Sequence, residues 1–409
     1  MGAEQPDGSS AAAPSEAKDA PLAGVRVVEL SHVLAAPTCG LMLADLGAEV
    51  VKVERPPRGD TQRWDTAEED RLGLESASFV QVNRGKASVC LDLKTPEGRD
   101  RLHALLRHAD VLLENYRPGV LERLGFGYDA LKPRYPSLVY CSISGFGRSG
   151  PMAAQGGFDL MAQAMSGIMS ITGVDGGERP GKCGPPVTDI AAGLLAAIGI
   201  LAALHRQKRS GKGERVETSL FEAGIMMTYW QSAIAFASGQ TPPALGTAHP
   251  LYAPYQAFPT ADGWMTVGTA NERNWQRLLD VLDLPELKRD ERFADGALRM
   301  KHRLALEALL TRKFLTKDRD AWLAILVEAG IPAAPVLTVN QMHAHPQTRA
   351  RRMVIEVPHA EAGTARAIGC PIKFAEAELP EPTGAPVLPP IQGWRSGSSA
   401  KGAKPQAGE

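Results

Sequence analysis

Residues 24–54 read GVRVVELSHVLAAPTCGLMLADLGAEVVKVE. Two β-branched runs, VRVVEL and AEVVKVE, enclose a helix-like segment that stops at Gly47. Outward from this stretch, SVCLDL, DVLLEN and LVYCSISGFG are typical of strands, and helical spacing begins again at Pro96 and in GVLERLGFGYDALKPRYP. Strands that alternate with helical segments predict an α/β fold, in which helices cover the faces of a parallel sheet.

Ligands of such sheets bind outside the carboxyl ends of the strands. Four predicted strands are followed by HVLAAP, ERPPRGD, ENYRPG and SGFGRSGP, so a binding site is expected in these loops. Other familiar signatures are missing from the sequence, which contains no P-loop, G-x-S-x-G or H-E-x-x-H.

A long helix is predicted in TDIAAGLLAAIGILAALHRQKRSGKGERV. Thr188 and Asp189 are capping residue types at its start, and basic residues follow in its last turn. The segment is apolar nearly all round, so we expect it to be buried. Its apolar run, Ile190 to Leu204, is shorter than the ~20 residues that cross a bilayer, so no membrane span is expected.

The length of 409 residues favours two domains or one elaborated domain. After about residue 240 the chain becomes rich in Pro, Gly and Thr, AFPTADGWMTVG indicates a hairpin around Asp262 and Gly263, and charged helical segments follow. We expect residues 21–225 and 331–395 to form a large domain and residues 226–330 a small one. Residues 1–20 and 396–409 have compositions typical of disorder.

Composition narrows the function. A net charge of -1 gives no overall attraction to nucleic acid or to an anionic membrane, so anion binding must come from local basic groups. The five cysteines are scattered, with no C-x-x-C and no zinc-like spacing to histidine. We therefore expect reduced core cysteines and no metal, although a single catalytic cysteine stays open. The N-terminus has neither a signal-peptide core nor transit-peptide arginines, which predicts a cytoplasmic protein.

Several ordered blocks together resemble the class III CoA-transferases. They are PLAGVRVVELSHVLAAPTCGLMLADLGAEVVKVERPPRGDTQRW, VNRGKASVCLDLKTPEG, ENYRPGVLERLGFGY, SGFGRSGP, VTDIAAGL and GKGERVETSLFEA. This family includes formyl-CoA, carnitine and succinyl-CoA:dicarboxylate CoA-transferases and the α-methylacyl-CoA racemases, and the resemblance runs from about residue 21 to about 375. It implies a Rossmann-like, CoA-binding large domain and two chains interlocked as a homodimer. It also implies acyl-CoA and small carboxylic acids as substrates, without a permanently bound cofactor.

The resemblance places the catalytic nucleophile at Asp189. A carboxylate there attacks the thioester, and covalent catalysis divides one difficult acyl exchange into easier steps. We expect the positive end of the helix to keep this carboxylate ionised. The residues by themselves favour a simpler role, since aspartate commonly caps helices.

Contacts with CoA fall, by resemblance, on loop residues and on cations suited to phosphates. They are His32, Val33, Arg55, Leu91, Lys94, Asn115, Tyr116 and Arg123. Taken one at a time, each Arg or Lys is more commonly a solvated surface charge. Leu34 and Gly156 depart from the glutamine and lysine of the formyl-CoA branch, and ALGTAHPLYAPYQ replaces its tetraglycine lid, which disfavours formyl and oxalate chemistry.

The acceptor acid is indicated by VNRGK, SITGVDGGERPGK and HPLYAPYQAF, which look most like the succinyl-CoA:dicarboxylate branch. Our hypothesis is that Arg84 pairs with the second carboxylate of the acid, because arginine binds carboxylates bidentately. A loop cap or a CoA contact is an equal alternative for Arg84. His32 is a candidate for orienting the acyl group, with a structural histidine as its alternative.

A racemase of this family needs an acid/base pair, which its G-H-D stretch supplies on one side. Here the stretch reads Gly157-Phe158-Asp159, and phenylalanine carries no proton, so racemase activity is disfavoured and Asp159 is expected to be structural. A non-catalytic CoA-binding paralogue is disfavoured by the presence of Asp189.

Overall fold

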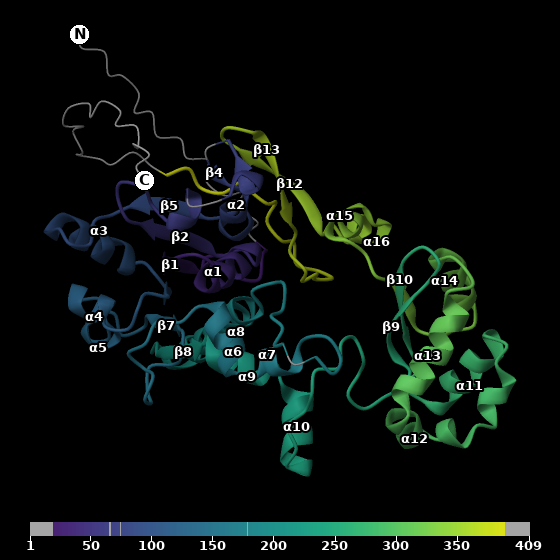
Figure 1. Ribbon diagram of the computed structural model, residues 1–409. Coiled ribbons are helices and arrows are strands. Elements are labelled where there is room, and N and C mark those ends of the chain that lie inside the picture. The colour runs from purple at the N-terminus through teal and green to yellow at the C-terminus, as the bar shows by residue number, and fades with distance from the viewer. Residues whose placement is uncertain (1–18, 65–66, 74, 178, 389–409) are drawn as a thin grey trace, which may run out of the picture. The chain divides into compact units, whose positions relative to one another are not determined.

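The computed structural model describes residues 19–388 apart from 65–66, 74 and 178 (Figure 1). Its described residues form two compact units: one contains residues 19–144, 193–218 and 355–388, and the other contains residues 145–192 and 219–354. These units begin and end at other residues than the domains expected from the sequence, and those domain boundaries stay a prediction. Most of the N-terminal segment and all of the C-terminal segment expected to be disordered lie outside the described residues.

The first unit is built on a six-stranded sheet in the order β5-β2-β1-β6-β7-β8. Strand β1 pairs in parallel with β2 and β6, β2 pairs in parallel with β5, and β6 pairs in parallel with β7. In chain order this arrangement is 3-2-1-4-5-6, the strand order of a Rossmann fold. The α/β prediction is confirmed. The strands are β1 (Arg26–Leu30), β2 (Glu49–Glu54), β5 (Ala87–Cys90), β6 (Val111–Glu114), β7 (Val139–Ser144) and β8 (Arg215–Ser219).

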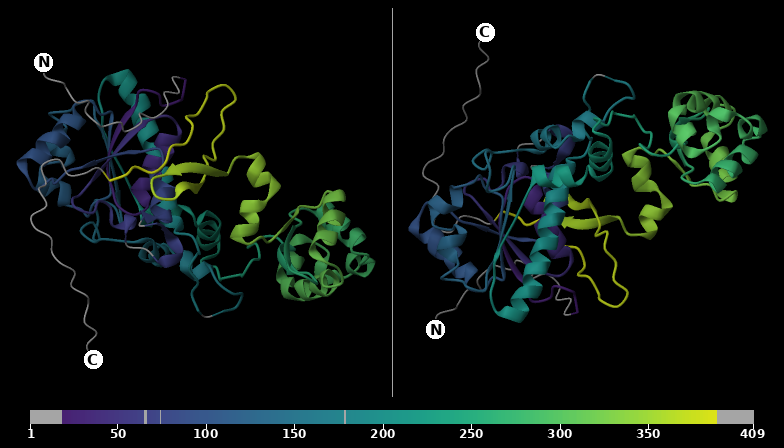
Figure 2. Two further views of the ribbon diagram at one scale, coloured as in Figure 1. Left: turned by 90° about the horizontal axis from the view of Figure 1, so that it is seen from above. Right: turned by 90° about the horizontal axis from the view of Figure 1, so that it is seen from below.

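Helices cover both faces of this sheet, with α3, α4 and α5 on one side and α1 and α8 on the other (Figure 2). Alternate strand residues such as Val28 and Leu112 pack with Leu102 and Leu121 of the first group. Helix α3 begins where the sequence predicts, at Pro96, after a Thr95 hydroxyl that accepts from the Gly98 amide at 3.1 Å. These helices are α1 (Ala35–Asp45), α3 (Pro96–Leu106), α4 (Val120–Leu124), α5 (Tyr128–Leu131) and α8 (Val187–Ser210).

Helix α8 packs closely on α1, because a Cβ atom at Gly193 would lie 2.5 Å from the Ala35 carbonyl oxygen. The expectation that α8 is buried all round is wrong for this chain. Its side chains Ile190, Leu194 and Ile198, spaced four residues apart, are 36%, 41% and 62% exposed. By length and composition α8 is also apolar enough to cross a membrane, a test that core helices of soluble proteins pass as well.

The C-terminal residues return to the first unit, as the sequence predicts. Strands β12 (Val354–His359) and β13 (Gly363–Ile368) form a two-stranded sheet, and β13 packs on helix α2 (Ala77–Asn83). The Gln81 side chain donates to the Arg366 carbonyl at 2.8 Å and accepts from the Ile368 amide at 3.0 Å. A short sheet of β3 (Arg71–Leu72) and β4 (Glu75–Ser76) precedes α2.

The second unit contains a helical part and a three-stranded antiparallel sheet, β11-β10-β9, packed with its own helices. Phe258, Trp275, Phe314 and Trp322 belong to its core. The chain turns between β9 and β10 at Asp262 and Gly263, which confirms the predicted hairpin. The strands are β9 (Tyr255–Pro259), β10 (Trp264–Gly268) and β11 (Ala333–Pro335).

The helices of the second unit are α6 (Asp159–Met165), α7 (Ile168–Ile171), α9 (Leu220–Met226), α10 (Tyr229–Ser238), α11 (Glu272–Val281), α12 (Gly296–Lys301), α13 (Arg303–Phe314), α14 (Arg319–Glu328), α15 (Val339–Ala344) and α16 (Pro346–Ala350). The short 3-10 helices are Thr61–Arg63 and Glu68–Asp70 in the first unit, and Pro285–Lys288 and Glu291–Phe293 in the second.

Candidate active site

The strand order of the first unit reverses between β1 and β6, and the loops after these two strands are joined by hydrogen bonds. The His32 amide donates to the Asn115 side-chain oxygen at 2.9 Å, and the Asn115 side-chain nitrogen donates to the His32 carbonyl at 2.9 Å. The rings of His32 and Tyr116 stack with centroids 4.5 Å apart and planes within 7°. Dinucleotides bind at this switch point in Rossmann folds, so three predicted CoA contacts lie where the fold favours a ligand.

Val33, the next residue after His32, has a φ of 60° and a side chain that is 44% exposed. A positive φ is strained for a β-branched side chain, and strained backbone clusters at ligand sites. The strain therefore supports a functional role for this loop.

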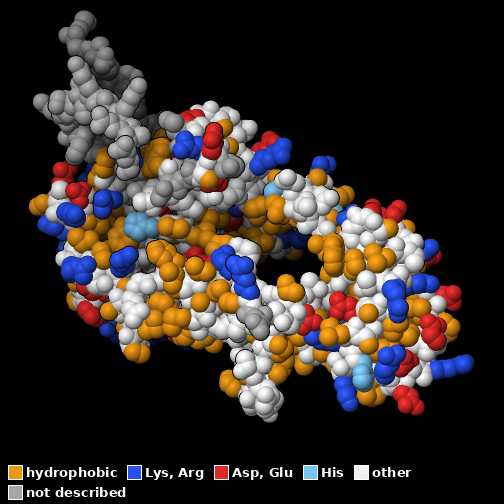
Figure 3. Space-filling view, in the orientation of Figure 1, with side chains coloured by type: hydrophobic (Ala, Val, Ile, Leu, Met, Phe, Trp, Pro, Cys, Tyr) orange, Lys and Arg blue, Asp and Glu red, His pale blue; other side chains and the backbone are white. Residues whose placement is uncertain are grey.

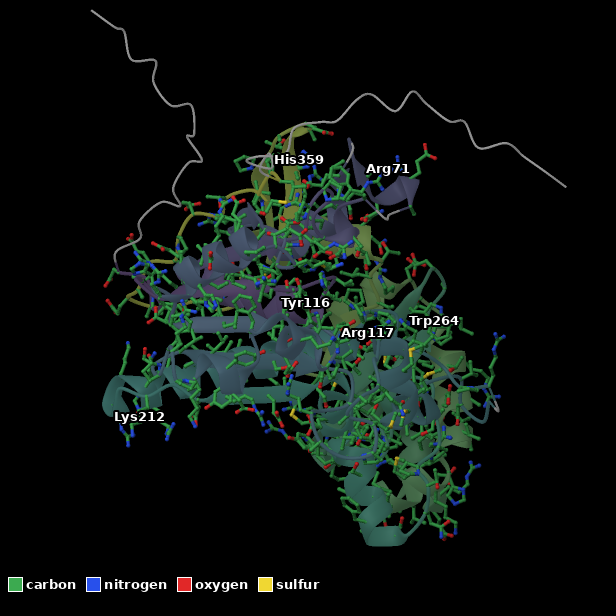
Figure 4. All side chains as sticks on the ribbon, turned by 90° about the vertical axis from the view of Figure 1, so that its left-hand side faces the viewer. Arg71, Tyr116, Arg117, Lys212, Trp264 and His359 are labelled. Carbon is green, nitrogen blue, oxygen red and sulfur yellow. The ribbon has the colours of Figure 1, made fainter. Side chains whose placement is uncertain are left out.

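Three predicted cations lie in exposed positions near the carboxyl ends of neighbouring strands. Arg55 directly follows β2, Lys94 follows β5, and Arg123 lies in α4 beyond β6. The amide of buried Leu91 donates to the Glu54 carbonyl at 2.9 Å, which holds the end of β5 beside the end of β2. Exposed guanidinium and ammonium groups at one edge of the sheet suit phosphate binding. Figure 4 shows Tyr116 and Arg117 near each other at this loop, well away from Lys212 beyond the end of α8.

Burial lowers the pKa of His32, and the charges of Lys52 and Arg55 lower it further. Asp60 and Glu54 act in the opposite direction without cancelling these effects. His32 is therefore mostly neutral at neutral pH, so it can accept or donate one hydrogen bond without adding a charge beside a phosphate.

A buried charge network lies beneath these loops, and the sequence-based reasoning missed it. Lys52 lies 2.8 Å from the Ser31 hydroxyl, 3.0 Å from Asp60 and 3.4 Å from Glu29, and none of the three charged side chains is exposed. Burial alone would lower the pKa of Lys52, but the carboxylates of Glu29 and Asp60 outweigh it and raise that pKa. Lys86 joins Glu29 from another side at 2.9 Å.

Lys86 and Glu29 of this network also pack against helix α1. Burial lowers the pKa of Lys86 to about 8, despite the attraction of Glu29. A Cβ atom at Gly40 of α1 would lie 1.8 Å from a Glu29 carboxylate oxygen, so only glycine fits there. The available sequence signal was the presence of Glu29 and Lys52 inside the apolar runs VVEL and VVKVE, since strands of a covered parallel sheet are normally apolar throughout.

Arg84 does not lie free for a substrate, which corrects our hypothesis for it. Its side chain is 2% exposed, and its guanidinium binds both carboxylate oxygens of Asp45, one of them at 2.8 Å. It also donates to the Ile368 carbonyl at 2.9 and 3.2 Å. The Arg84 guanidinium thus connects α1 to β13, and these hydrogen bonds stabilise the fold.

Asp189 is the third residue of α8, which begins at Val187. The residue is half-buried. We expected the positive end of the helix to keep its carboxylate ionised, but its pKa is raised to about 7, first by burial and then by the negative charge of Asp159. A carboxyl group of this kind is typical of functional sites rather than of solvent-facing helix caps.

The first turn of α8 is held by Asp159, the first residue of α6. One Asp159 carboxylate oxygen accepts from the Thr188 amide at 3.0 Å and from the Thr188 hydroxyl at 2.8 Å. The other accepts from the Gln163 side chain at 2.7 Å, and Gln163 in turn accepts from the Cys183 amide at 3.0 Å. Phe158, just before Asp159, is 64% exposed and offers no acid or base.

The described residues contain no group of three or more His, Cys, Asp or Glu side chains that could hold a metal ion. The five cysteines are free thiols, and Cys39 and Cys141 are buried. Burial raises the pKa of both thiols, which makes either a poor nucleophile.

Comparison with known proteins agrees with this arrangement. The sequence model of CoA-transferase family III matches residues 22–389. A succinate–glutarate CoA-transferase of Agrobacterium fabrum is 38% identical, over 84% of this chain and 86% of its own. A succinyl-CoA:glutarate CoA-transferase of Homo sapiens is 34% identical, over 90% of this chain and 83% of its own.

Among solved structures, a CAIB/BAIF family protein from Brucella suis matches with a TM-score of 0.79 and 39% identity, covering 90% of this chain and 97% of its own. Sequence and fold thus agree over nearly the whole described chain. The chain belongs to CoA-transferase family III.

Proposed function

We propose that this CoA-transferase moves CoA from an acyl-CoA, with succinyl-CoA the foremost donor, to a small dicarboxylic acid through a covalent intermediate on Asp189. The observation that carries the proposal is the environment of Asp189. It combines a helix N-terminus, partial burial and a pKa raised to about 7. A carboxylate with a raised pKa is a stronger nucleophile than a solvated one, and burial protects an acyl intermediate from water.

In the proposed first half-reaction, an Asp189 carboxylate oxygen attacks the thioester carbonyl, the carbon–sulfur bond breaks, and CoA leaves as its thiolate. The product on the enzyme is a mixed anhydride. The thiolate then attacks the Asp189 carbonyl carbon, the carbon–oxygen bond of the anhydride breaks, and the donor acid leaves as a carboxylate. The enzyme is left with an aspartyl-CoA thioester, and no proton is gained or lost.

The second half-reaction reverses these steps with the acceptor acid. Its carboxylate attacks the Asp189 thioester and releases the thiolate, which then attacks the acceptor carbonyl and frees Asp189. The positive end of the α8 dipole would favour the negative charge that develops on oxygen at Asp189.

We assign CoA binding to the loops at the sheet edge of the first unit. Arg55, Lys94 and Arg123 supply cations for phosphates, and the stacked rings of His32 and Tyr116 supply an aromatic surface beside a neutral imidazole. The other contacts carried over from the family are Val33, Leu91 and Asn115.

The proposal of a dicarboxylic acceptor rests on the relatives. One is named a succinate–glutarate CoA-transferase and another a succinyl-CoA:glutarate CoA-transferase. The second carboxylate must find a cation other than Arg84, which is engaged by Asp45. Racemase activity has no support at Phe158, which cannot transfer a proton. A non-catalytic CoA-binding role would leave the raised pKa of Asp189 without use.

We propose further that two copies of the chain form a homodimer in the cytoplasm. Helix α10 is apolar, yet none of its residues is buried, and Tyr229, Trp230 and Phe236 are 70%, 57% and 88% exposed. Figure 3 shows hydrophobic side chains on the outside of this helical part of the second unit. A second copy would cover these side chains together with the exposed face of α8. Five free thiols suit a reducing compartment.

The test is a transfer assay with succinyl-CoA and a panel of mono- and dicarboxylic acids, followed as new acyl-CoA by mass spectrometry. The proposal predicts transfer to dicarboxylic acids that is lost in Asp189→Ala and kept in Asp129→Ala, a change at an exposed aspartate of α5. Undiminished transfer by Asp189→Ala would remove the covalent mechanism. Exchange of the α-proton of an acyl-CoA without any free acid would favour the racemase instead.

A further inference from the structure

Asp159 is a buried carboxylate to which the sequence assigned only a structural role. It is 7% exposed, and each of its hydrogen bonds described above comes from a donor: two from Thr188 and one from Gln163. Three donors and no acceptor are the environment of a carboxylate anion. A buried negative charge therefore lies next to the first turn of α8, at Thr188, the residue just before Asp189.

The nearest opposite charge neutralises Asp159 only in part. Lys182 Nζ lies 3.9 Å from the Asp159 carboxylate, its side chain is 39% exposed, and it also donates to the carbonyls of Cys183 and Gly184. On α9, which packs on α6, Glu222 accepts from the Ser219 hydroxyl at 2.6 Å and adds no positive charge. The groups around Asp189 thus leave it beside a net negative charge.

This arrangement has a direct consequence for the proposed reaction. Free Asp189 is negative, but Asp189 in the anhydride or in the CoA thioester is neutral. Burial and a neighbouring anion both raise the free energy of the negative form and leave the neutral forms nearly unchanged. Acylation of Asp189 therefore relieves a repulsion that the resting enzyme carries.

Building on the proposed function, we infer that Asp159 is a positioning residue with two effects. It holds the first turn of α8 through Thr188, and its buried charge destabilises the free Asp189 carboxylate relative to the acylated enzyme. Asp159 thereby shifts the equilibrium toward the covalent intermediate and makes the free carboxylate more reactive.

The test separates charge from structure by three variants. Asp159→Asn removes the charge, but it places the side-chain NH2 group of the new asparagine against the side-chain NH2 group of Gln163. Gln163 is held in this orientation because its side-chain oxygen accepts from the Cys183 backbone amide. In the double variant Asp159→Asn with Gln163→Glu, the new asparagine donates to the new glutamate, which still accepts from the Cys183 amide. Every hydrogen bond then has a donor and an acceptor again, and the negative charge lies on residue 163, farther from Thr188. Lys182→Met removes the partial compensation at a side chain that is 39% exposed.

Two quantities are measured for each variant: the apparent pKa of the acidic limb of kcat/KM, and the fraction of enzyme trapped as aspartyl-CoA thioester at equal succinyl-CoA and succinate. The wild-type limb should lie near the pKa of Asp189, at about 7. In Asp159→Asn the limb should fall by about one unit. The trapped fraction, measured where the thioester is a minority species, should fall about tenfold, because one pKa unit corresponds to a tenfold change in an equilibrium.

The double variant should recover the thermal stability of the wild-type protein, but its apparent pKa and its trapped fraction should stay below the wild-type values. Lys182→Met should raise both the apparent pKa and the trapped fraction. If Asp159→Asn does not fold, the double variant and Lys182→Met decide the matter. An unchanged limb and trapped fraction in the folded variants would overturn the inference and leave the proposed function standing. Absence of any Asp189 adduct in the wild-type enzyme would overturn both.

Discussion

The ammonium group of Lys52 lies 3.0 Å from the carboxylate of Asp60, and neither side chain is exposed to solvent. Lys52 lies in the middle of β2, and Asp60 follows the loop that contains Arg55. The same ammonium group contacts Ser31, next to His32. One buried lysine thus connects the two loops that are predicted to bind CoA.

Lys52→Met should destabilise the protein by about 3–5 kcal/mol, because removing one partner leaves buried carboxylates uncompensated. The free energy of unfolding in denaturant measures this loss. Arg26→Met is the matched control: Arg26 pairs with Glu49 at 3.2 Å, but both side chains are more than half exposed. An exposed pair contributes less than about 1 kcal/mol. Equal losses in the two variants would contradict a role for the buried network.

Arg84→Gln should lower stability by a similar amount, about 3–5 kcal/mol, because it strands the Asp45 carboxylate. The KM for a dicarboxylic acceptor should stay within about twofold of the wild-type value. Adding Asp45→Asn to Arg84→Gln should recover part of the stability, since no unpaired buried charge remains. A large rise in KM with unchanged stability would restore Arg84 as a substrate ligand.

Asp189→Asn should make the protein more stable at neutral and alkaline pH. The folded pKa of Asp189, about 7, lies above its ordinary value of 3.8, so the folded state binds more protons between these values. The stabilising contribution is therefore present below about pH 4 and is lost as the pH rises through about 7. One pKa unit corresponds to about 1.4 kcal/mol, which limits the gain in the variant to a few kcal/mol.

Thermal or denaturant unfolding across this pH range provides the measurement for Asp189. The advantage of Asp189→Asn over the wild-type protein should grow with pH, whereas Asp129→Asn, at an exposed position, should show no such trend. A constant difference between Asp189→Asn and wild type would mean that Asp189 has no raised pKa.

Much of the fold could be predicted from the sequence, because alternating β-branched runs and helical spacing encode a covered parallel sheet. The start of α3 at Pro96 and the hairpin at Asp262 and Gly263 are local features, and both were predicted correctly. The strand order could not be read from periodicity, because it depends on contacts between residues far apart in the chain.

The candidate site also has features that could be predicted from the sequence and features that depend on contacts between distant residues. Asp189 was identified by family resemblance, and no local pattern would have separated it from a helix cap. Arg84 was misjudged because its partners, Asp45 and Ile368, lie 39 and 284 residues away in the sequence. The raised pKa of Asp189 depends on Asp159 and on burial, neither of which a helix-start argument includes.

Ile198→Glu should break the proposed homodimer, because it places a charge on the exposed apolar face of α8, at its most exposed large hydrophobic side chain. Analytical ultracentrifugation should show a dimer for the wild-type protein and a monomer for this variant. Val327→Glu is the control, since Val327 in α14 is equally exposed, at 62%, but lies on a different helix. A monomeric wild-type protein would contradict the dimer.

Oxygen transfer from the acceptor acid to Asp189 tests the covalent mechanism most directly. The acceptor is labelled with oxygen-18 in both carboxylates, and the enzyme is recovered after turnover with succinyl-CoA for mass analysis of the peptide that contains Asp189. When the thiolate cleaves the second anhydride, the bridging oxygen stays with Asp189, so that peptide should carry the label, and succinate released in later turnovers should carry it as well. Efficient CoA transfer with an unlabelled Asp189 peptide and unlabelled succinate would contradict the account.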